Sequence, residues 1–205
     1  MLKLIVFDVD GTLAETYTIK LLPRVRDFFH LVCKAGCRHS PALALATNQG
    51  GVGMRYWMEQ HGFGNPARFP AQQDVEQRLH NLVARLGADP LLSVYASYRY
   101  QNQSGEWAPV PPGQEANPRW LEGWRKPQPG MLLQAMADAG VTAHQTLFVG
   151  DSADDQAAAQ AAGCAFEWAK GFFAREWESC DHLSRFLSRF KPSPVAEPGR
   201  LARPG

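Results

Sequence analysis

The chain has 205 residues, of which 45% are hydrophobic, and its formal net charge at pH 7 is +1. This length suits a single α/β domain with a small insertion. The near-neutral charge provides no overall basic field for nucleic acid, and no apolar stretch approaches the ~18 residues of a membrane span. The composition therefore indicates a globular domain and argues against membrane-spanning and broadly nucleic-acid-binding proteins.

The first predicted element is a strand over residues 4–7, whose apolar side chains indicate burial on both faces. It runs directly into Asp8, Asp10 and Gly11. Because side chains at i and i+2 of an extended segment point the same way, the two carboxylates should project together. Such a pair beside an apolar core usually needs a cation or a proton, and Mg²⁺ favours oxygen ligands. Taken alone, however, an Asp-x-Asp is more often a turn.

The following segments alternate between helical and strand patterns. The predicted elements are a helix over 20–35 that stops at Gly36, a strand over 42–46, a helix over 72–86 and a strand over 91–96. The strand over 42–46 runs into Thr47, Asn48 and a loop with glycines at 50, 51 and 53. No Lys-Ser or Lys-Thr pair follows these glycines, so we interpret them as a flexible turn or as backbone that approaches a ligand closely.

Residues 97–125 interrupt this alternation with aromatic side chains, arginines and prolines. A loop of this length inside a compact domain is usually functional or mobile. Its aromatic and arginine side chains suit stacking on nucleobases, as in proteins that bind single strands. The same aromatics are also compatible with a small core that closes over the loop. Both interpretations of this aromatic loop insertion stay open from the sequence.

Regular periodicity returns after the aromatic loop. The predicted elements are helices over 129–139, 153–162 and 174–190, strands over 146–149 and 164–168, and a disordered tail over 191–205. Strands that alternate with helices predict an α/β fold, a doubly wound parallel sheet with helices on both faces. We expect one domain over 1–190 without a large cap, and a ligand site beyond the carboxyl ends of the strands.

The cysteines show no dense disulfide framework, so we expect reduced thiols. Cys33 and Cys37 lie four residues apart on a predicted helix and share one face. A zinc site there would need further ligands, with His30 or His39 nearest, and ordinary packing is the favoured interpretation.

Polar clusters fall at or near the ends of the predicted strands. They are Asp8 with Asp10, Thr47 with Asn48, Arg125 with Lys126, and Gly150-Asp151 with Asp155. Each cluster has an ordinary explanation when taken alone: a turn, a solvated lysine, or acids that cap the following helix. Their joint occurrence at strand ends instead favours one shared site, because the carboxyl ends of parallel strands meet at one edge of the sheet.

With these clusters the chain resembles the haloacid dehalogenase (HAD) superfamily of phosphohydrolases over residues 3–170. The motifs that carry the resemblance occur in order: Asp8-Val9-Asp10-Gly11-Thr12, Thr47, Lys126, and Gly150-Asp151 with Asp155. Two further stretches resemble the branch that contains heptose bisphosphate phosphatases, histidinol phosphatases and polynucleotide 3′-phosphatases. These stretches are Thr47-Asn48-Gln49 and Arg125-Lys126-Pro127-Gln128-Pro129-Gly130-Met131.

The resemblance implies a Mg²⁺-dependent phosphomonoesterase that works through an aspartyl phosphate. Asp8 would be the nucleophile, and Asp10 would protonate the leaving oxygen and then activate water. The Thr47 hydroxyl and Lys126 would hold the phosphate and balance its charge. The carboxylates of Asp8 and Asp151 and the backbone carbonyl of Asp10 would hold Mg²⁺.

The resemblance assigns supporting roles to three further residues. Asn48 and Arg125 would contact the phosphate together with Thr47 and Lys126, and Asp155 would orient Lys126 or the water shell of the metal. The short segment between Asp10 and Thr47 leaves no room for a large cap. The site is therefore expected to be open, which admits a small metabolite or a polymer end.

A small phosphorylated metabolite is the favoured substrate, and a nucleic acid 3′-phosphate is the alternative. Heptose bisphosphate phosphatases usually carry a zinc loop of cysteines, but no cysteine lies between Cys37 and Cys164. An alternative from another class is a non-catalytic binding or scaffold protein on a HAD fold. A mutase-type phosphotransfer would need water exclusion, against which the lack of a large cap argues. We expect a cytoplasmic enzyme with no membrane contact, because no targeting segment is evident.

Overall fold

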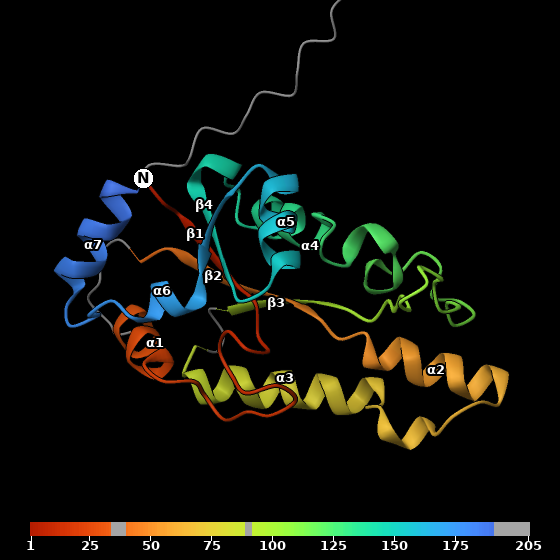
Figure 1. Cartoon of the computed structure of the whole chain (residues 1–205). Helices are drawn as coiled ribbons and strands as arrows, with labels where there is room; N and C mark the ends of the chain where they lie inside the picture. The colour runs from red at the N-terminus through yellow and green to blue at the C-terminus, as the bar shows by residue number, and fades with distance from the viewer. Residues whose placement is uncertain (34–39, 89–91, 191–205) are drawn as a thin grey trace, which may run out of the picture.

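The computed structural model describes residues 1–33, 40–88 and 92–190. Its centre is a five-stranded parallel sheet in the order β3-β2-β1-β4-β5 (Figure 1). The strands are β1 (Leu4–Phe7), β2 (Ala42–Asn48), β3 (Leu92–Ser97), β4 (Thr146–Gly150) and β5 (Ala165–Trp168). The chain first winds outward from β1 to β3 and then returns to the other side of β1, so the strand order reverses between β1 and β4. The predicted doubly wound α/β fold is confirmed.

Helices cover both faces of the sheet (Figure 1). They are α1 (Val25–Cys33), α2 (Gly51–His61), α3 (Gln72–Leu86), α4 (Gly130–Asp138), α5 (Ala153–Ala162), α6 (Ala169–Phe173) and α7 (Cys180–Arg189), with short 3₁₀ turns at Pro66–Arg68, Pro118–Trp120, Glu122–Trp124 and Ala143–Gln145. Buried residues of α1, α3, α6 and α7 form one core cluster, and those of α4 and α5 form a second. None of the helices in the described ranges is long and apolar enough to cross a membrane.

Strand β1 lies at the centre of the sheet and contributes to both cores. Ile5 and Phe7 belong to the cluster under α1 and α3, whereas Leu4 and Val6 belong to the cluster under α4 and α5. This division follows the period-two alternation of side chains along a strand. The register of β1 is therefore set by apolar packing on both faces, and the residue after Phe7 must emerge at the carboxyl edge of the sheet.

The first helix is shorter than the predicted helix over 20–35. Residues before it form a loop that folds back on the segment after β1, with an isolated bridge between Ala14 and Leu21 and a hydrogen bond from the Leu22 amide to the Leu13 carbonyl. These backbone groups are satisfied by tertiary pairing, so the helix begins only at Val25.

The helix predicted over 174–190 begins later in the structure, because α7 starts only at Cys180 and a separate short helix, α6, ends at Phe173. Ser179 caps α7, and its hydroxyl accepts a hydrogen bond from the His182 amide. Between the helices, the buried Trp177 donates from its indole nitrogen to the Phe172 carbonyl at 3.2 Å. The apolar residues of both helices thus reach one core although the helical axis is broken.

The expectation that the cysteines are reduced thiols is only partly met, and some expectations concern residues that the structure does not describe. Cys180 is disulfide-bonded, so the expectation of reduced thiols does not hold for it. Cys33 and Cys164 are free cysteines. The predicted helix stop at Gly36, the zinc alternative that uses Cys37 and His39, and the tail over 191–205 fall outside the described residues.

The interpretation of the glycines after β2 as a flexible turn is wrong, because Gly51 and Gly53 lie in the first turn of α2. The Gly53 amide donates to the Tyr98 carbonyl at 3.1 Å. A Cβ on Gly53 would overlap that same carbonyl oxygen, whereas a Cβ on Gly123 would meet open space. Glycine therefore lets α2 approach the backbone that follows β3.

Gly53→Ala is expected to destabilise the protein by about 1–3 kcal/mol, because backbone must move to admit the methyl group. Urea unfolding followed by circular dichroism measures this loss. The matched variant Gly123→Ala should stay within about 0.5 kcal/mol of the parent protein. Equal stability of the two variants would contradict the close approach of α2 to this segment.

Candidate active site

The carboxyl ends of β1, β2 and β4 bring the first polar cluster to the centre of the sheet edge. Phe7 is paired with Leu45 on β2 and with Val149 on β4. The Asp8 amide still donates to the Val149 carbonyl at 2.9 Å, so the carboxylate of Asp8 leaves the sheet between these two strands. This place is the topological switch point, where open α/β sheets bind their ligands.

Lys126 joins three parts of the chain in a buried ion-pair cluster. Its ammonium lies 2.5 Å from Asp8 Oδ1 and 2.6 Å from Asp155 Oδ1, and it donates to the Ala46 carbonyl at 2.8 Å. All three charged side chains are at least nine-tenths buried. Two carboxylates face one ammonium, so the cluster carries a net negative charge that favours a further cation.

The ionisation of this cluster follows from burial and from its neighbours. Burial raises the pKa of Asp8 to about 6, although the charge of Lys126 opposes the shift. Burial alone would lower the pKa of Lys126, but the carboxylates of Asp8 and Asp155 outweigh it and raise that pKa above the usual range. Lys126 is therefore charged at neutral pH, and Asp8 is mostly ionised above pH 6.

Asp151 completes an acidic cluster with Asp8 and Asp155. One carboxylate oxygen of each residue lies within 4.8 Å of the others. Asp151 is exposed to solvent, and Thr12 Oγ1 donates to its Oδ1 at 3.4 Å. Gly11 has a φ of +83°, and a Cβ there would overlap Asp151 Oδ2, so the position requires glycine. Burial and the charge of Asp155 raise the pKa of the Asp151 carboxyl.

The donor set of this acidic cluster fits Mg²⁺. Its oxygens are hard ligands, three carboxylates exceed the single ammonium of Lys126, and the exposed Asp151 leaves room for water and for a phosphate oxygen. Asp155 is the most firmly held member, because its Oδ2 accepts from the Ser152 amide at 3.0 Å and hydroxyl at 2.7 Å. It therefore orients Lys126 and begins α5 at the same time.

Asp10 points into a separate network that the sequence did not predict. Arg78 donates to both of its carboxylate oxygens, at 2.7 and 2.9 Å, and Gln49 donates to Oδ2 at 2.8 Å. The Tyr17 amide donates to Oδ1 at 2.9 Å. Burial alone would raise the pKa of Asp10, but Arg78 outweighs it and holds that pKa below its usual range.

The sequence carries little signal for Arg78 and Gln49. Arg78 occupies a polar position of the amphipathic helix α3, where a solvated arginine is the ordinary expectation. Gln49 follows Thr47 and Asn48 in the motif, but nothing in its type separates a contact to Asp10 from a turn. Only the packing of α3 against the segment after β1 brings these side chains together.

Thr47 and Asn48 lie at the end of β2. Thr47 is buried, and its hydroxyl accepts from Gln49 Nε2 at 2.9 Å. Both amide atoms of Asn48 contact the backbone of Lys126: Nδ2 donates to its carbonyl at 2.9 Å, and Oδ1 accepts from its amide at 3.1 Å. Asn48 thus fixes the backbone of Lys126, while a contact from its side chain to phosphate stays a prediction.

Arg125 brings a second cation to the β2–α2 turn. Its Nη1 is buried next to Gly50 and has no hydrogen-bond partner among the described residues. Burial lowers the pKa of its guanidinium. A buried guanidinium nitrogen without a hydrogen-bond partner is costly, so an anion at this turn would stabilise it, in line with the predicted phosphate contact.

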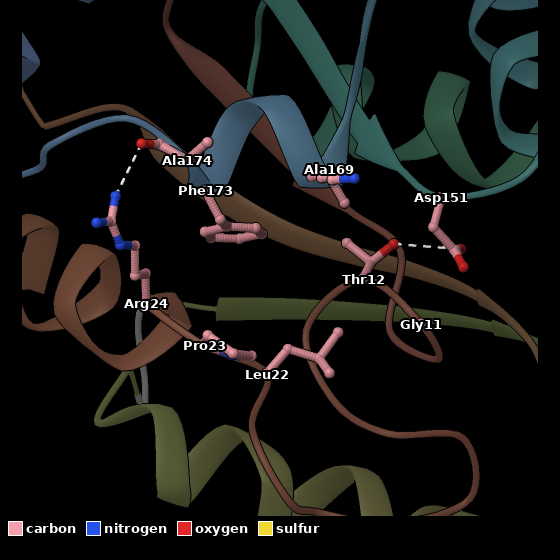
Figure 2. Close-up of a pocket in the computed structure, with 10 residues that line it drawn as sticks. Gly11, Thr12, Leu22, Pro23, Arg24, Asp151, Ala169, Phe173 and Ala174 are labelled. Atoms are coloured by element: carbon pink, nitrogen blue, oxygen red, sulfur yellow. Dashed lines mark hydrogen bonds between the residues drawn. The ribbon is translucent and has the colours of Figure 1, made fainter.

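A cavity of about 620 Å³ reaches Asp151 from the side of α1 and α6 (Figure 2). Figure 2 shows the hydrogen bond between Thr12 and Asp151 at one end of the cavity. Arg24 lies at the other end and donates to the Ala174 carbonyl at 2.8 Å. The ring of Phe173 lies between these ends. The acidic cluster is therefore open to solvent on the Asp151 side.

None of the aromatic side chains of residues 97–125 is fully exposed, although Tyr100 and Trp107 are only half-buried. Tyr98 and Trp120 are buried, with ring centroids 5.8 Å apart. Trp124 is half-buried, and its indole nitrogen donates to the Ala96 carbonyl at 3.1 Å. Of the two interpretations of this segment, the small core is the one that these contacts favour.

Fold and site together define an α/β protein with acids and a lysine assembled at a topological switch point. A family model described as HAD-hydrolase-like matches residues 123–179, which include Lys126, Asp151 and Asp155. This part of the chain, which carries the lysine and two of the acids of the site, is similar to haloacid dehalogenase-like hydrolases.

Curated relatives match a limited part of the chain. A phosphoglycolate phosphatase of Pseudomonas putida KT2440 is 52% identical over 50 residues, which cover 22% of this chain and 18% of that protein. A second P. putida relative aligns over 20% of its length. The chain thus matches about a fifth of the length of these curated relatives.

Two solved structures share the fold at low sequence identity. A HAD-like protein from Mesorhizobium loti has a TM-score of 0.55 at 21% identity, over 80% of this chain and 70% of that one. The D,D-heptose 1,7-bisphosphate phosphatase from B. bronchiseptica, solved with magnesium and phosphate, has a TM-score of 0.52 at 20% identity. That match covers 91% of this chain and 98% of the phosphatase. At these identities the likeness concerns the fold.

Proposed function

We propose that this protein is a Mg²⁺-dependent phosphomonoester hydrolase that works through an aspartyl phosphate on Asp8. The observation that carries the proposal is the buried Asp8 carboxylate, held 2.5 Å from the Lys126 ammonium with an oxygen within 4.8 Å of one from Asp151. Positive charge beside the nucleophile is what an attack by one anion on another requires. The phosphatases among its relatives support this reaction class.

In the first step, a carboxylate oxygen of Asp8 forms a bond to phosphorus while the bond from phosphorus to the ester oxygen breaks. Lys126 and the Thr47 hydroxyl hold the phosphate oxygens as negative charge shifts onto them. The carboxylates of Asp8 and Asp151 and the backbone carbonyl of Asp10 would hold Mg²⁺, which would supply further positive charge beside the phosphate. The leaving oxygen takes a proton from the protonated form of Asp10, which the ion pair with Arg78 disfavours in the free protein.

In the second step, Asp10 removes a proton from the water that hydrolyses the acyl phosphate and so regenerates the Asp8 carboxylate. The ion pair with Arg78 favours the ionised form of Asp10, which is the form that acts as a base. Asp155 touches neither phosphate nor water in this scheme and acts by positioning Lys126.

A small phosphorylated metabolite is the substrate class that we favour. The nucleic acid alternative depended on exposed aromatic side chains, and Tyr98 and Trp120 are buried instead. The direct test is phosphate release from p-nitrophenyl phosphate and from a panel of sugar and amino-alcohol phosphates, with Mg²⁺ or with EDTA. Release that requires Mg²⁺ and is lost in Asp151→Asn supports the proposal. A folded protein that hydrolyses none of these esters would instead be a binding protein.

The affinity for Mg²⁺ is expected to weaken as the pH falls. A proton on Asp8 competes with the metal, and the pKa of Asp8 in the metal-free protein is about 6. One pH unit below that pKa, about a tenth of the sites are ionised, so the apparent affinity at pH 5 should be about tenfold weaker than at neutral pH. Isothermal titration calorimetry measures it, and an unchanged affinity would contradict the assignment of Asp8 as a ligand.

A further inference from the structure

A second cavity, of about 540 Å³, opens beside Asp10. We call it the Asp10-side cavity. Its walls include Tyr17, Gln49, Arg68, Phe69, Asp74 and Arg78. It is distinct from the cavity that reaches Asp151, because the two share no lining residue.

This cavity is joined to Asp10 by direct hydrogen bonds. Arg78 and Gln49 donate to the Asp10 carboxylate from their side chains, and Tyr17 donates from its backbone. In the proposed reaction Asp10 protonates the ester oxygen of the substrate. Whatever carbon group is attached to that oxygen must therefore lie on the Asp10 side of the phosphate, within reach of these walls.

Two arginines and one aspartate line the cavity. The Arg78 guanidinium is bound to Asp10, whereas Arg68 is exposed and forms no salt bridge within the described ranges. The acid of the cavity wall, Asp74, already accepts a hydrogen bond from the Ala71 amide at 3.0 Å. Arg68 is thus the cation left available, and a guanidinium binds carboxylates and phosphates through paired hydrogen bonds.

The remaining walls limit the size of the occupant. Phe69, Pro70 and Val75 provide an apolar side against which a short carbon chain can pack. We propose that the Asp10-side cavity holds the leaving group of the substrate and selects phosphomonoesters whose leaving group carries its own anionic group, with Arg68 as the recognising residue. This inference rests on the proposed hydrolase function and names its substrate class.

A matched pair of substrates tests the inference. 3-Phosphoglycerate carries a carboxylate where glycerol 3-phosphate carries a neutral hydroxymethyl group. We expect kcat/KM for 3-phosphoglycerate to be at least about tenfold higher, the usual size of a charge-assisted contact. A second pair compares kcat/KM for propane-1,3-diol bisphosphate with that for propane-1,3-diol monophosphate. This pair shows whether a second phosphate is preferred in place of a carboxylate. A preference in either pair supports the inference.

Variants of Arg68 identify the residue responsible. Arg68→Gln should bring the kcat/KM ratio of the preferred pair close to one, mainly through a higher KM for the anionic ester, and Arg68→Lys should retain part of the preference. Arg85→Gln, an exposed arginine two turns further along α3 than Arg78, is the matched control and should keep the parent ratio.

The possible failures are distinguishable. Hydrolysis of p-nitrophenyl phosphate with ratios near one in both pairs would overturn the inference and leave the hydrolase proposal intact. A preference that survives in Arg68→Gln would overturn the role of Arg68. The absence of hydrolysis of every ester would overturn both proposals.

Discussion

Asp8→Asn is expected to lower kcat for any phosphomonoester by at least about a thousandfold, because loss of a covalent nucleophile leaves only binding and charge stabilisation. The side chain is 6% exposed and lies where both the phosphate and the metal are expected. Asparagine has nearly the same shape but cannot form the acyl phosphate. Phosphate release measured with Mg²⁺ at saturating substrate gives the value.

The fold should survive this substitution. Burial disfavours the ionised form of Asp8, as its raised pKa shows, and Lys126 keeps its ion pair with Asp155 at 2.6 Å. Thermal unfolding without Mg²⁺ should therefore show no large loss of stability. Asp27→Asn, on the exposed side of α1, is the matched control and should keep full activity. Retained turnover in a cleanly purified Asp8→Asn protein would refute the proposed mechanism.

Lys126→Met is expected to abolish turnover and to lower the free energy of unfolding by about 3–5 kcal/mol. The substitution keeps the length of the side chain but leaves the carboxylates of Asp8 and Asp155 buried without their shared cation. Chemical denaturation in EDTA measures the loss. Added Mg²⁺ should recover part of the stability, because the metal replaces some of the missing positive charge.

A double variant separates charge repulsion from lost packing. In Lys126→Met with Asp8→Asn, one of the facing carboxylates is neutral, so the double variant should be more stable than Lys126→Met alone. Lys3→Met, at an exposed position, is the control and should stay within about 0.5 kcal/mol of the parent protein. A Lys126→Met protein of parental stability would show that the ammonium does not hold the cluster together.

Local patterns were sufficient to predict the strands and most helices. The continuous apolar run of β1 reflects burial on both faces and the helical spacing of α3 reflects burial on one face, so the sequence pattern identifies both elements. The start of α2 lacks such a signal, because glycines usually break helices. The Tyr98 carbonyl lies so close to Gly53 that a side chain would not fit, which explains a glycine inside this helix. This contact joins segments far apart in the chain, so the sequence pattern does not reveal it.

The sequence by itself determined that acids, a threonine and a lysine follow strand ends, because motif spacing and the alternation of strands and helices are local properties of the chain. Only the tertiary structure decided which of these charged and polar side chains pair with one another. Lys126 joined Asp8 and Asp155, whereas Arg78 and Gln49 took the carboxylate of Asp10. The partner of a charged side chain depends on which helix packs across the sheet edge, and no spacing along the chain encodes that distance in space.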